Sequence, residues 1–267
     1  MSKISDAAFK GVCDYFFRIS GIRLTEGKRA LVLSRLHRLS QDCGFPDLNE
    51  FIARLTRGQL GEDVAVAVVD RLTTNETYFF REPAHFADLR QRAQGHRAGE
   101  EFSVWSAASS TGEEAYSCAM LLADTLGKAP WRIWGTDLST TVVAAARTGL
   151  YPVDRIENMP ENYLKRYCLR GEGPYEGQML IDRSLRQRVE FLGANLTQDL
   201  PQRLPMFDVI FLRNVLIYFE PPAKADIVRR VITRLKPDGL LYTGHAESLS
   251  GLDLPLQSIA PAIYRHD

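Results

Sequence analysis

One segment of the chain, residues 102–117, constrains the fold more than any other. Residues 102–105 form an apolar run that suits a buried strand, and Glu113 opens a stretch with helical spacing. The residues between them are small, so the backbone can pass close to a ligand there. A strand, a loop of small residues and a helix, in this order, are typical of the cofactor loop of an α/β fold.

Two further apolar runs end in polar residues. The run 131–135 leads into Asp137, about twenty-five residues beyond the loop, where nucleotide-binding folds place a carboxylate that binds ribose hydroxyls. As an alternative, Asp137 caps the helix that follows it. The nearby loop favours the ligand role. A third run, 207–212, ends at Arg213 and Asn214. Polar groups at three strand ends predict one shared binding crevice.

The pattern of apolar residues divides the chain into two parts. Helical spacing over residues 6–20, 24–42, 47–57 and 61–72 predicts a small helical domain first. Beyond Pro83, short apolar runs alternate with helical stretches, which predicts an α/β, Rossmann-like domain: a parallel sheet with helices on both faces. Its expected elements are 102–106, 113–126, 131–136, 139–147, 189–193, 207–212, 223–235, 239–244 and 261–265. The glycine-rich segment 169–178 and the alternating residues after it predict a small inserted β-hairpin.

Composition and charge argue against several classes of function. Lysine and arginine number 33, as do aspartate and glutamate, so no overall field favours nucleic acid or an anionic membrane. The four cysteines show no Cys-x-x-Cys spacing, and no stretch suits a signal peptide or a membrane span. We therefore expect a reduced, cytoplasmic protein. Histidines 85, 96, 245 and 266 show no metal-ligand spacing, and we expect no metal.

The cofactor loop favours S-adenosylmethionine over a dinucleotide. No Gly-x-Gly-x-x-Gly pattern occurs around residues 106–112, so the pyrophosphate fingerprint is missing. A positively charged sulfonium also tolerates an acid such as Glu113, where a phosphate would be repelled. Asp137 would then bind the ribose, and Asn195 with Leu196, after the run 189–192, would hold the adenine edge.

A polar and aromatic segment, residues 73–81, lies between the two predicted domains and has the sequence Thr-Thr-Asn-Glu-Thr-Tyr-Phe-Phe-Arg. By itself it is consistent with a domain interface in which Arg81 pairs with an acid. Further motifs follow in order, namely Ser-Ala-Ala-Ser-Ser-Thr-Gly-Glu-Glu-Ala-Tyr-Ser at 106–117, Arg-Asn-Val-Leu-Ile-Tyr-Phe at 213–219, Leu-Lys-Pro-Asp-Gly at 235–239 and Gly-His-Ala-Glu-Ser at 244–248. Over essentially its whole length the chain resembles the chemotaxis receptor methyltransferases, the protein-glutamate O-methyltransferases of the CheR family.

The resemblance implies a function and a set of site residues. Family members transfer a methyl group from S-adenosylmethionine to glutamates on chemoreceptor cytoplasmic helices, leaving S-adenosylhomocysteine. It implies a receptor-docking domain at 1–72, a linker with cofactor contacts at 73–90, and a methyltransferase domain at 91–267 with a β insertion near 169–190. The implied cofactor-binding residues are Asn75, Thr77, Arg81, Glu113, Asp137, Asn195, Leu196, Arg213 and Asn214. Tyr218 resembles the active-site tyrosine of the family.

The chemistry agrees with these roles. A glutamate side chain has a pKa of about 4.3, so it is already a nucleophile at neutral pH and needs no general base. The protein must instead exclude water and align the reacting groups. We expect Arg81 and Tyr218 to be the catalytic residues, although Arg81 is also suited to the cofactor's own carboxylate. Without the motif, the run Ile-Tyr-Phe would favour a plain core tyrosine at Tyr218.

The basic face of one helix is a candidate for substrate docking. Lys28, Arg35 and Arg38 fall on one side of a helix predicted to begin near Glu26. They form either a docking surface for an acidic receptor bundle or a solvated face. We expect a monomer that binds neither nucleic acid nor membrane. Two other functions remain open: a regulatory module that binds S-adenosylmethionine without catalysis, and a methyltransferase acting on nucleic acid, which would carry a motif such as Asn-Pro-Pro-Tyr where this chain has 213–218.

Overall fold

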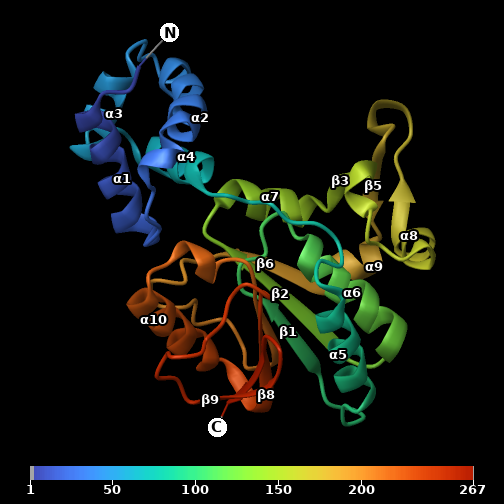
Figure 1. The fold of residues 1–267 in the computed structure, drawn as a ribbon. Coiled ribbons are helices and arrows are strands. Elements are labelled where there is room, and N and C mark those ends of the chain that lie inside the picture. Colours follow the sequence, from blue (N-terminus) through green and yellow to red (C-terminus); the bar gives the residue numbers. More distant parts are fainter. Residues whose placement is uncertain (1–2, 267) are drawn as a thin grey trace. The chain divides into compact units, whose positions relative to one another are not determined.

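The computed structural model describes residues 3–266, which form two compact units. The first unit extends to Thr74 and also includes Tyr218–Ala223, and the second holds the remainder of the chain (Figure 1). Each unit has its own buried apolar residues. None of the helices within residues 3–266 combines the length and the apolar character needed to cross a bilayer.

The first unit is helical, as its spacing predicts. It contains α1 (Asp6–Ser20), α2 (Arg29–Asp42), α3 (Leu48–Thr56) and α4 (Glu62–Leu72). Ser5 caps α1 by accepting the N–H of Ala8, and Gly21 ends it with a positive φ of 73°. The helix expected over 24–42 is divided, because a 3-10 turn, η1 (Glu26–Lys28), precedes α2. Lys28 therefore lies before the first α-helical turn.

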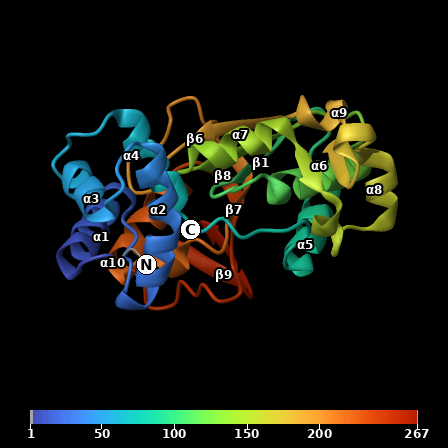
Figure 2. The ribbon, with the colours of Figure 1, turned by 90° about the horizontal axis from the view of Figure 1, so that it is seen from above.

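The second unit is built on a seven-stranded sheet in the order β6-β2-β1-β7-β8-β10-β9. The strands are β1 (Phe102–Ser106), β2 (Trp131–Asp137), β6 (Val189–Gly193), β7 (Phe207–Leu212), β8 (Leu235–Thr243), β9 (Leu256–Ala260) and β10 (Ile263–His266). Helices α5 (Pro83–Gln94) and α6 (Glu113–Leu126) lie on one side of the sheet, and α10 (Pro221–Ile232) lies on the other (Figures 1 and 2). The α/β class with helices on both faces is confirmed.

The prediction of a parallel sheet is wrong at one edge. The first five strands in this order run parallel, but β10 is antiparallel to both β8 and β9. Only Pro261 and Ala262 separate β9 from β10, and so short a connection can join only antiparallel strands. The strand β9 was not predicted, because its residues are mostly exposed and form no apolar run.

The inserted β subdomain is larger than the predicted hairpin. Strands β4 (Cys168–Arg170) and β5 (Gln178–Ile181) form the hairpin, and β3 (Leu150–Pro152) adds a third antiparallel strand. A Cβ at Gly171 would lie 2.0 Å from the carbonyl oxygen of Tyr175, so the turn requires glycine there. The remaining helical segments are α7 (Thr140–Thr148), η2 (Val153–Ile156), α8 (Glu161–Tyr167), η3 (Gly173–Tyr175), α9 (Arg183–Arg186) and η4 (Leu216–Tyr218).

Candidate active site

The strand order identifies one edge of the main sheet as a ligand site. Strands β2 and β6 extend the sheet on one side of β1, and β7 and β8 extend it on the other. The order therefore reverses between β1 and β7, and in open α/β sheets ligands bind outside the carboxyl ends of the strands at such a point. Because β2, β1 and β7 are parallel neighbours, their carboxyl ends lie on one edge, as predicted.

The loop after β1 is held by hydrogen bonds from its backbone N–H groups to residues of β2. The N–H of Ser109 donates to the carbonyl oxygen of Thr136 at 2.8 Å, and that of Ser110 donates to Oδ2 of Asp137 at 2.8 Å. At Gly112 φ is +98°, and a Cβ would lie 2.9 Å from Cβ of Ala146. Only glycine fits this position, because both the backbone conformation and the close packing exclude a side chain.

Asp137 fixes the connection between the loop and β2. Its Oδ1 accepts the N–H of Ser139 at 3.0 Å, while its Oδ2 holds Ser110. The helix cap of α7 is Ser139, whose hydroxyl accepts the N–H of Val142. The alternative in which Asp137 itself caps that helix is therefore wrong. Asp137 lies at the carboxyl end of β2, the position that suits a ribose ligand.

Glu113 is enclosed at the start of α6. Its side chain is 1% exposed, Oε2 accepts the hydroxyl of Thr111 at 2.6 Å, and Oε1 pairs with Nη1 of Arg155 at 3.1 Å. Burial raises the pKa of Glu113, and the bonds from Thr111 and Arg155 offset part of that rise. The same Arg155 nitrogen donates to the carbonyl oxygen of Thr77 at 3.2 Å. Glu113 and Arg155 thus connect the loop to the segment of residues 75–82.

Arg213 is buried and holds two acids. Its Nη1 lies 3.0 Å from Oε2 of Glu114, its Nη2 lies 3.2 Å from Oε2 of Glu82, and Nη2 also donates to the carbonyl oxygen of Arg81. Burial raises the pKa of Glu114, and Arg213 and Ser106 counter only part of the rise. Burial would also raise the pKa of Glu82, but Arg213 and the N–H of His245 hold it below its ordinary value.

These contacts give Arg213 a role that the sequence did not suggest. Arg213 directly follows β7, and its guanidinium holds residues 81–82 at the carboxyl end of that strand. It does so as a buried residue. Burial and the charge of Arg213 also lower the pKa of the neighbouring His85 to about 4, so that ring is neutral at neutral pH. Glu82 and Glu114 were missed, although Glu114 stands directly beside Glu113 in the quoted motif.

The loop after β7 is held in place by a further buried acid, Glu247. Its carboxylate accepts the N–H of Asn214 at 2.6 Å, of Gly244 at 2.7 Å and of Ile217 at 3.2 Å. A Cβ at Gly244 would lie 2.7 Å from Nδ2 of Asn214, so the loops after β7 and β8 approach closely. The Gly-His-Ala-Glu-Ser motif thus joins two strand ends.

Backbone strain gathers at this edge. Four residues other than glycine adopt positive φ in the segments just described, namely Phe80 at 55°, Glu82 at 59°, Ser110 at 48° and Asn214 at 57°. Such conformations cost of the order of 1–3 kcal/mol each and persist where the surroundings impose them, which is common at ligand sites. The strained residues thus lie in residues 80–82, the loop after β1 and the loop after β7, which are the segments from which we expect the site to be built.

The structure brings together most of the predicted cofactor residues. The carbonyl oxygen of Asn75 accepts a hydrogen bond from the hydroxyl of Ser110 at 2.9 Å. The carbonyl oxygen of Thr77 accepts one from Nη1 of Arg155. Arg81 lies over the ring of Tyr78, 5.5 Å from its centroid. Asn195 and Leu196 follow β6, which pairs with β2. The side-chain oxygen of Asn195 accepts the N–H and hydroxyl of Thr197, and Leu196 is buried.

The remaining predicted residues belong to the first unit. Tyr218 ends the turn η4 and is partly buried. Lys28 and Arg38 are exposed, but Arg35 caps the carboxyl end of α4, with Nη1 2.7 Å from the carbonyl oxygen of Thr73. The guanidinium of Arg35 is therefore used in hydrogen bonds within the helical unit. Lys28 and Arg38 are the exposed cations of the predicted docking face.

The fold and the site together define a class of protein, the Rossmann-like methyltransferases that use S-adenosylmethionine. The defining features are an open, largely parallel sheet, a loop of small residues, an aspartate at the end of β2 and the lack of a pyrophosphate fingerprint. The model of the CheR methyltransferase SAM binding domain matches residues 75–263, and the model of the CheR methyltransferase all-alpha domain matches residues 7–73. The chain belongs to the CheR methyltransferase family.

Curated relatives support this assignment over nearly the whole chain. The chemotaxis protein methyltransferase of Salmonella typhimurium is 41% identical over 251 residues, which cover 93% of this chain and 86% of the relative. The protein of the same name from Escherichia coli is 41% identical over 252 residues, 94% of this chain and 87% of the relative. Chemotaxis protein methyltransferase 2 of Pseudomonas aeruginosa is 39% identical over 262 residues, 96% and 91% respectively.

Proposed function

We propose that the protein transfers the methyl group of S-adenosylmethionine to glutamate side chains of chemoreceptor cytoplasmic helices, which forms glutamate methyl esters. The main structural support for the proposal is the way in which residues 75–82 are held. Residues 75–82, which include most of the family motif at 73–81, are hydrogen-bonded at three points to other segments of their unit: Asn75 to Ser110, Thr77 to Arg155 and Arg81 to Arg213. The family and its named relatives supply the chemotaxis context.

The reaction requires positioning more than acid–base chemistry. S-adenosylmethionine supplies an electrophilic methyl group on a positively charged sulfur. A substrate glutamate is ionised at neutral pH and attacks without a base. In this proposal Asp137 binds the ribose, Asn195 and Leu196 hold the adenine, and Asn75, Thr77 and Arg81 reach the cofactor from residues 75–82. Arg81 and Tyr218 would align the substrate carboxylate and exclude water from it.

Two of the predicted cofactor residues act indirectly in the proposal. Glu113 and Arg213 are almost fully buried and paired, so they position the loop and residues 81–82. Asn214, held by Glu247, shapes the loop after β7. We further propose that the chain acts as a cytoplasmic monomer and that Lys28 and Arg38 attract the acidic receptor bundle. In this proposal the helical unit is the receptor-docking domain, as in the family.

The direct test is methylation of receptor fragments with radiolabelled S-adenosylmethionine. We expect label on receptor that is released as methanol in mild base, because methyl esters hydrolyse there and methylated amines do not. Arg81→Ala should abolish this transfer with a melting temperature within a few degrees of wild type. The matched control Arg132→Ala changes an exposed arginine on β2 and should remain active.

The alternatives give different results in the same assay. A regulatory module would bind S-adenosylmethionine and transfer no label to any substrate. A nucleic-acid methyltransferase would label DNA or RNA and leave the receptor fragments unlabelled. Base-stable label on the receptor would place the methyl group on another side chain and would contradict the glutamate assignment.

A further inference from the structure

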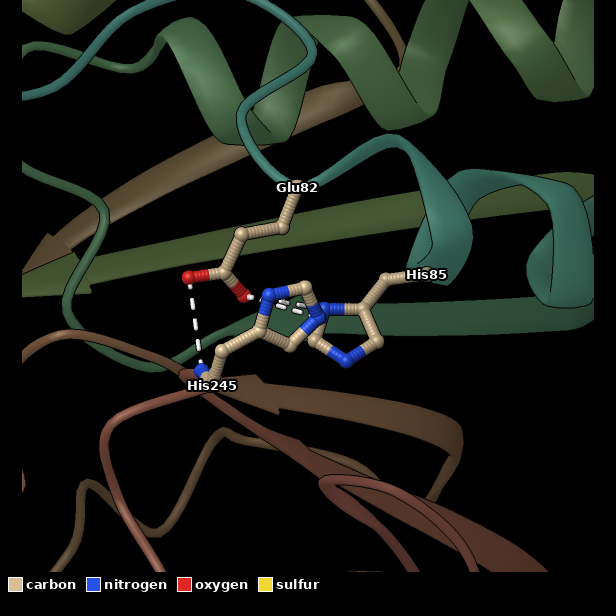
Figure 3. A group of neighbouring side chains, drawn as sticks. All are labelled: Glu82, His85 and His245. Carbon is tan, nitrogen blue, oxygen red and sulfur yellow. Dashed lines mark hydrogen bonds and ion pairs between the residues drawn. The ribbon is translucent and has the colours of Figure 1, made fainter.

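Two histidines and a glutamate from distant parts of the sequence meet near the carboxyl end of β8. Glu82 precedes α5, His85 lies in the first turn of α5, and His245 follows β8 after Gly244. Figure 3 shows the carboxylate of Glu82 facing both imidazole rings. Its Oε2 lies 3.4 Å from Nδ1 of His85 and 3.9 Å from Nε2 of His245. One ligand atom from each residue lies within 4.8 Å of the other two.

His85 is an unusual buried residue. It is 1% exposed, and neither of its ring nitrogens has a hydrogen-bond partner among residues 3–266. Stacking on Tyr242, with ring centroids 5.2 Å apart and an interplanar angle of 14°, fixes the ring, and Phe211 packs edge-on against it. A buried polar group without a partner costs about 1–3 kcal/mol. The orphaned Nδ1 faces a carboxylate oxygen, so a ligand that binds both atoms would recover this cost.

We propose that Glu82, His85 and His245 bind one divalent transition metal ion of the Zn²⁺ type. Two imidazole nitrogens and one carboxylate oxygen are a common zinc donor set, with a fourth position left for water. Ligands about 2.1 Å from a tetrahedral zinc ion stand about 3.4 Å from one another. The pair Glu82–His85 already has this spacing. His245 has to approach the Glu82 oxygen by about half an ångström and also has to come within about 3.4 Å of the His85 nitrogen, and its half-exposed side chain is free to move.

Arg213 limits how tightly such an ion binds. Its Nη2 lies 3.2 Å from the same Oε2 of Glu82, so an ion must share or displace that pairing. Arg213 keeps its second partner, Glu114, in either case. The other groups that face Glu82 are the Nδ2 of Asn214 at 3.5 Å and the N–H of His245 at 3.4 Å, both on Oε1. The site is therefore expected to bind more weakly than a structural zinc site and to loosen Arg213 from Glu82 when filled.

The spacing of the three residues explains why no zinc motif is visible in the sequence. His245 stands 163 positions after Glu82 in the numbering, so the short spacings that mark zinc motifs do not occur. The expectation of no metal rested on those spacings alone.

Metal titration of the full chain, stripped with a chelator, tests the proposal. Calorimetry with Zn²⁺ and visible absorption with Co²⁺ should show one ion per chain, bound through nitrogen and oxygen. His245→Ala should weaken Zn²⁺ binding by about a hundredfold or more, because even the loss of an outer-shell partner costs 10–100-fold. Glu82→Gln, which keeps the shape of the side chain, should also weaken it. The control His96→Ala removes a histidine outside the cluster and should bind like wild type.

Two results would overturn the proposal. One is the absence of saturable binding in a wild type whose circular dichroism shows it to be folded. The other is binding that His245→Ala and Glu82→Gln leave unchanged, because the ion would then be held elsewhere, for example by cysteines. The Co²⁺ spectrum separates these cases, since thiolate ligands give an intense charge-transfer band that nitrogen and oxygen ligands lack.

Discussion

At the scale of single residues, the site depends on buried and partly buried charges that are paired within the protein. Arg213 neutralises Glu82 and Glu114, Arg155 neutralises Glu113, and Glu247 is satisfied by three backbone N–H groups. An unpaired charge in such a position would be costly, so each pair fixes the geometry of one loop. These carboxylates hold the loops in place, and the residues that we expect to contact the ligand lie on or beside those loops.

Replacement of Arg213 should therefore destabilise the fold severely. Arg213→Met keeps the unbranched stem of the side chain but leaves two largely enclosed carboxylates without their cation, at a cost of about 3–5 kcal/mol. Urea denaturation should show this loss. Arg132→Met, on an exposed arginine of β2, should change the stability by less than about 0.5 kcal/mol. Equal stabilities of the two variants would mean that the Arg213 pairs contribute nothing.

At the scale of elements, the loop between β1 and α6 is the most constrained part of the fold. Gly112→Ala forces a side chain into a backbone with φ of +98° and against Ala146. We expect it to lower the stability by more than about 1 kcal/mol and to abolish binding of S-adenosylhomocysteine. Gly61→Ala, where a Cβ meets nothing within 4 Å, is the matched control. Cofactor binding by Gly112→Ala at wild-type affinity would contradict this account of the loop.

The small sheet makes a prediction about pH. Burial, with a smaller contribution from Asp182, raises the pKa of the Cys168 thiol on β4 to about 12. A thiol reacts through its thiolate, so alkylation by iodoacetamide should be slow at pH 8 and should rise about tenfold per pH unit toward pH 10. Mass spectrometry of the labelled peptide, with Cys168→Ser as the blank, measures the rate. A rate that levels off near pH 9 would show that the thiol is solvated.

How much could be predicted from the sequence differs between elements. Strands β1 and β7 matched their apolar runs closely, because strands buried on both faces leave a strong pattern, and β6 and the helix α6 also matched their predicted ranges. The linker was expected over residues 73–90, but its second half belongs to the helix α5, which begins at Pro83. The apolar residues of this helix are few and stand among charged ones, so the sequence pattern is weak there. The contact of Arg213 with Glu82 was not predictable, since 131 positions separate them and no local period connects them.

At the scale of the whole molecule, the two family models divide the chain near residue 74, as its two compact units do. A chain with equal numbers of acids and bases attracts an acidic partner only where its cations are locally concentrated. In the helical unit Lys28 and Arg38 are exposed, whereas Arg35 is occupied with α4.

Charge reversal tests this docking surface. Lys28→Glu with Arg38→Glu should raise the apparent Michaelis constant for receptor several-fold at low salt, and the difference should shrink as salt screens it. Affinity for S-adenosylhomocysteine should not change. The control Lys10→Glu with Arg57→Glu reverses two exposed cations of the same unit, with the same change in net charge. If both double mutants behave alike, Lys28 and Arg38 form only a solvated face.

The edge that carries the loop after β1 and Asp137 is expected to bind S-adenosylmethionine. Calorimetric titration with S-adenosylhomocysteine measures this binding. We predict saturable binding of one ligand per chain by the wild type, no binding of a nicotinamide dinucleotide, and a loss of about 1.5–3 kcal/mol of binding free energy in Asp137→Ala, which removes a charge-assisted hydrogen bond. Binding of the dinucleotide without S-adenosylhomocysteine, or equal affinity in Asp137→Ala, would contradict it.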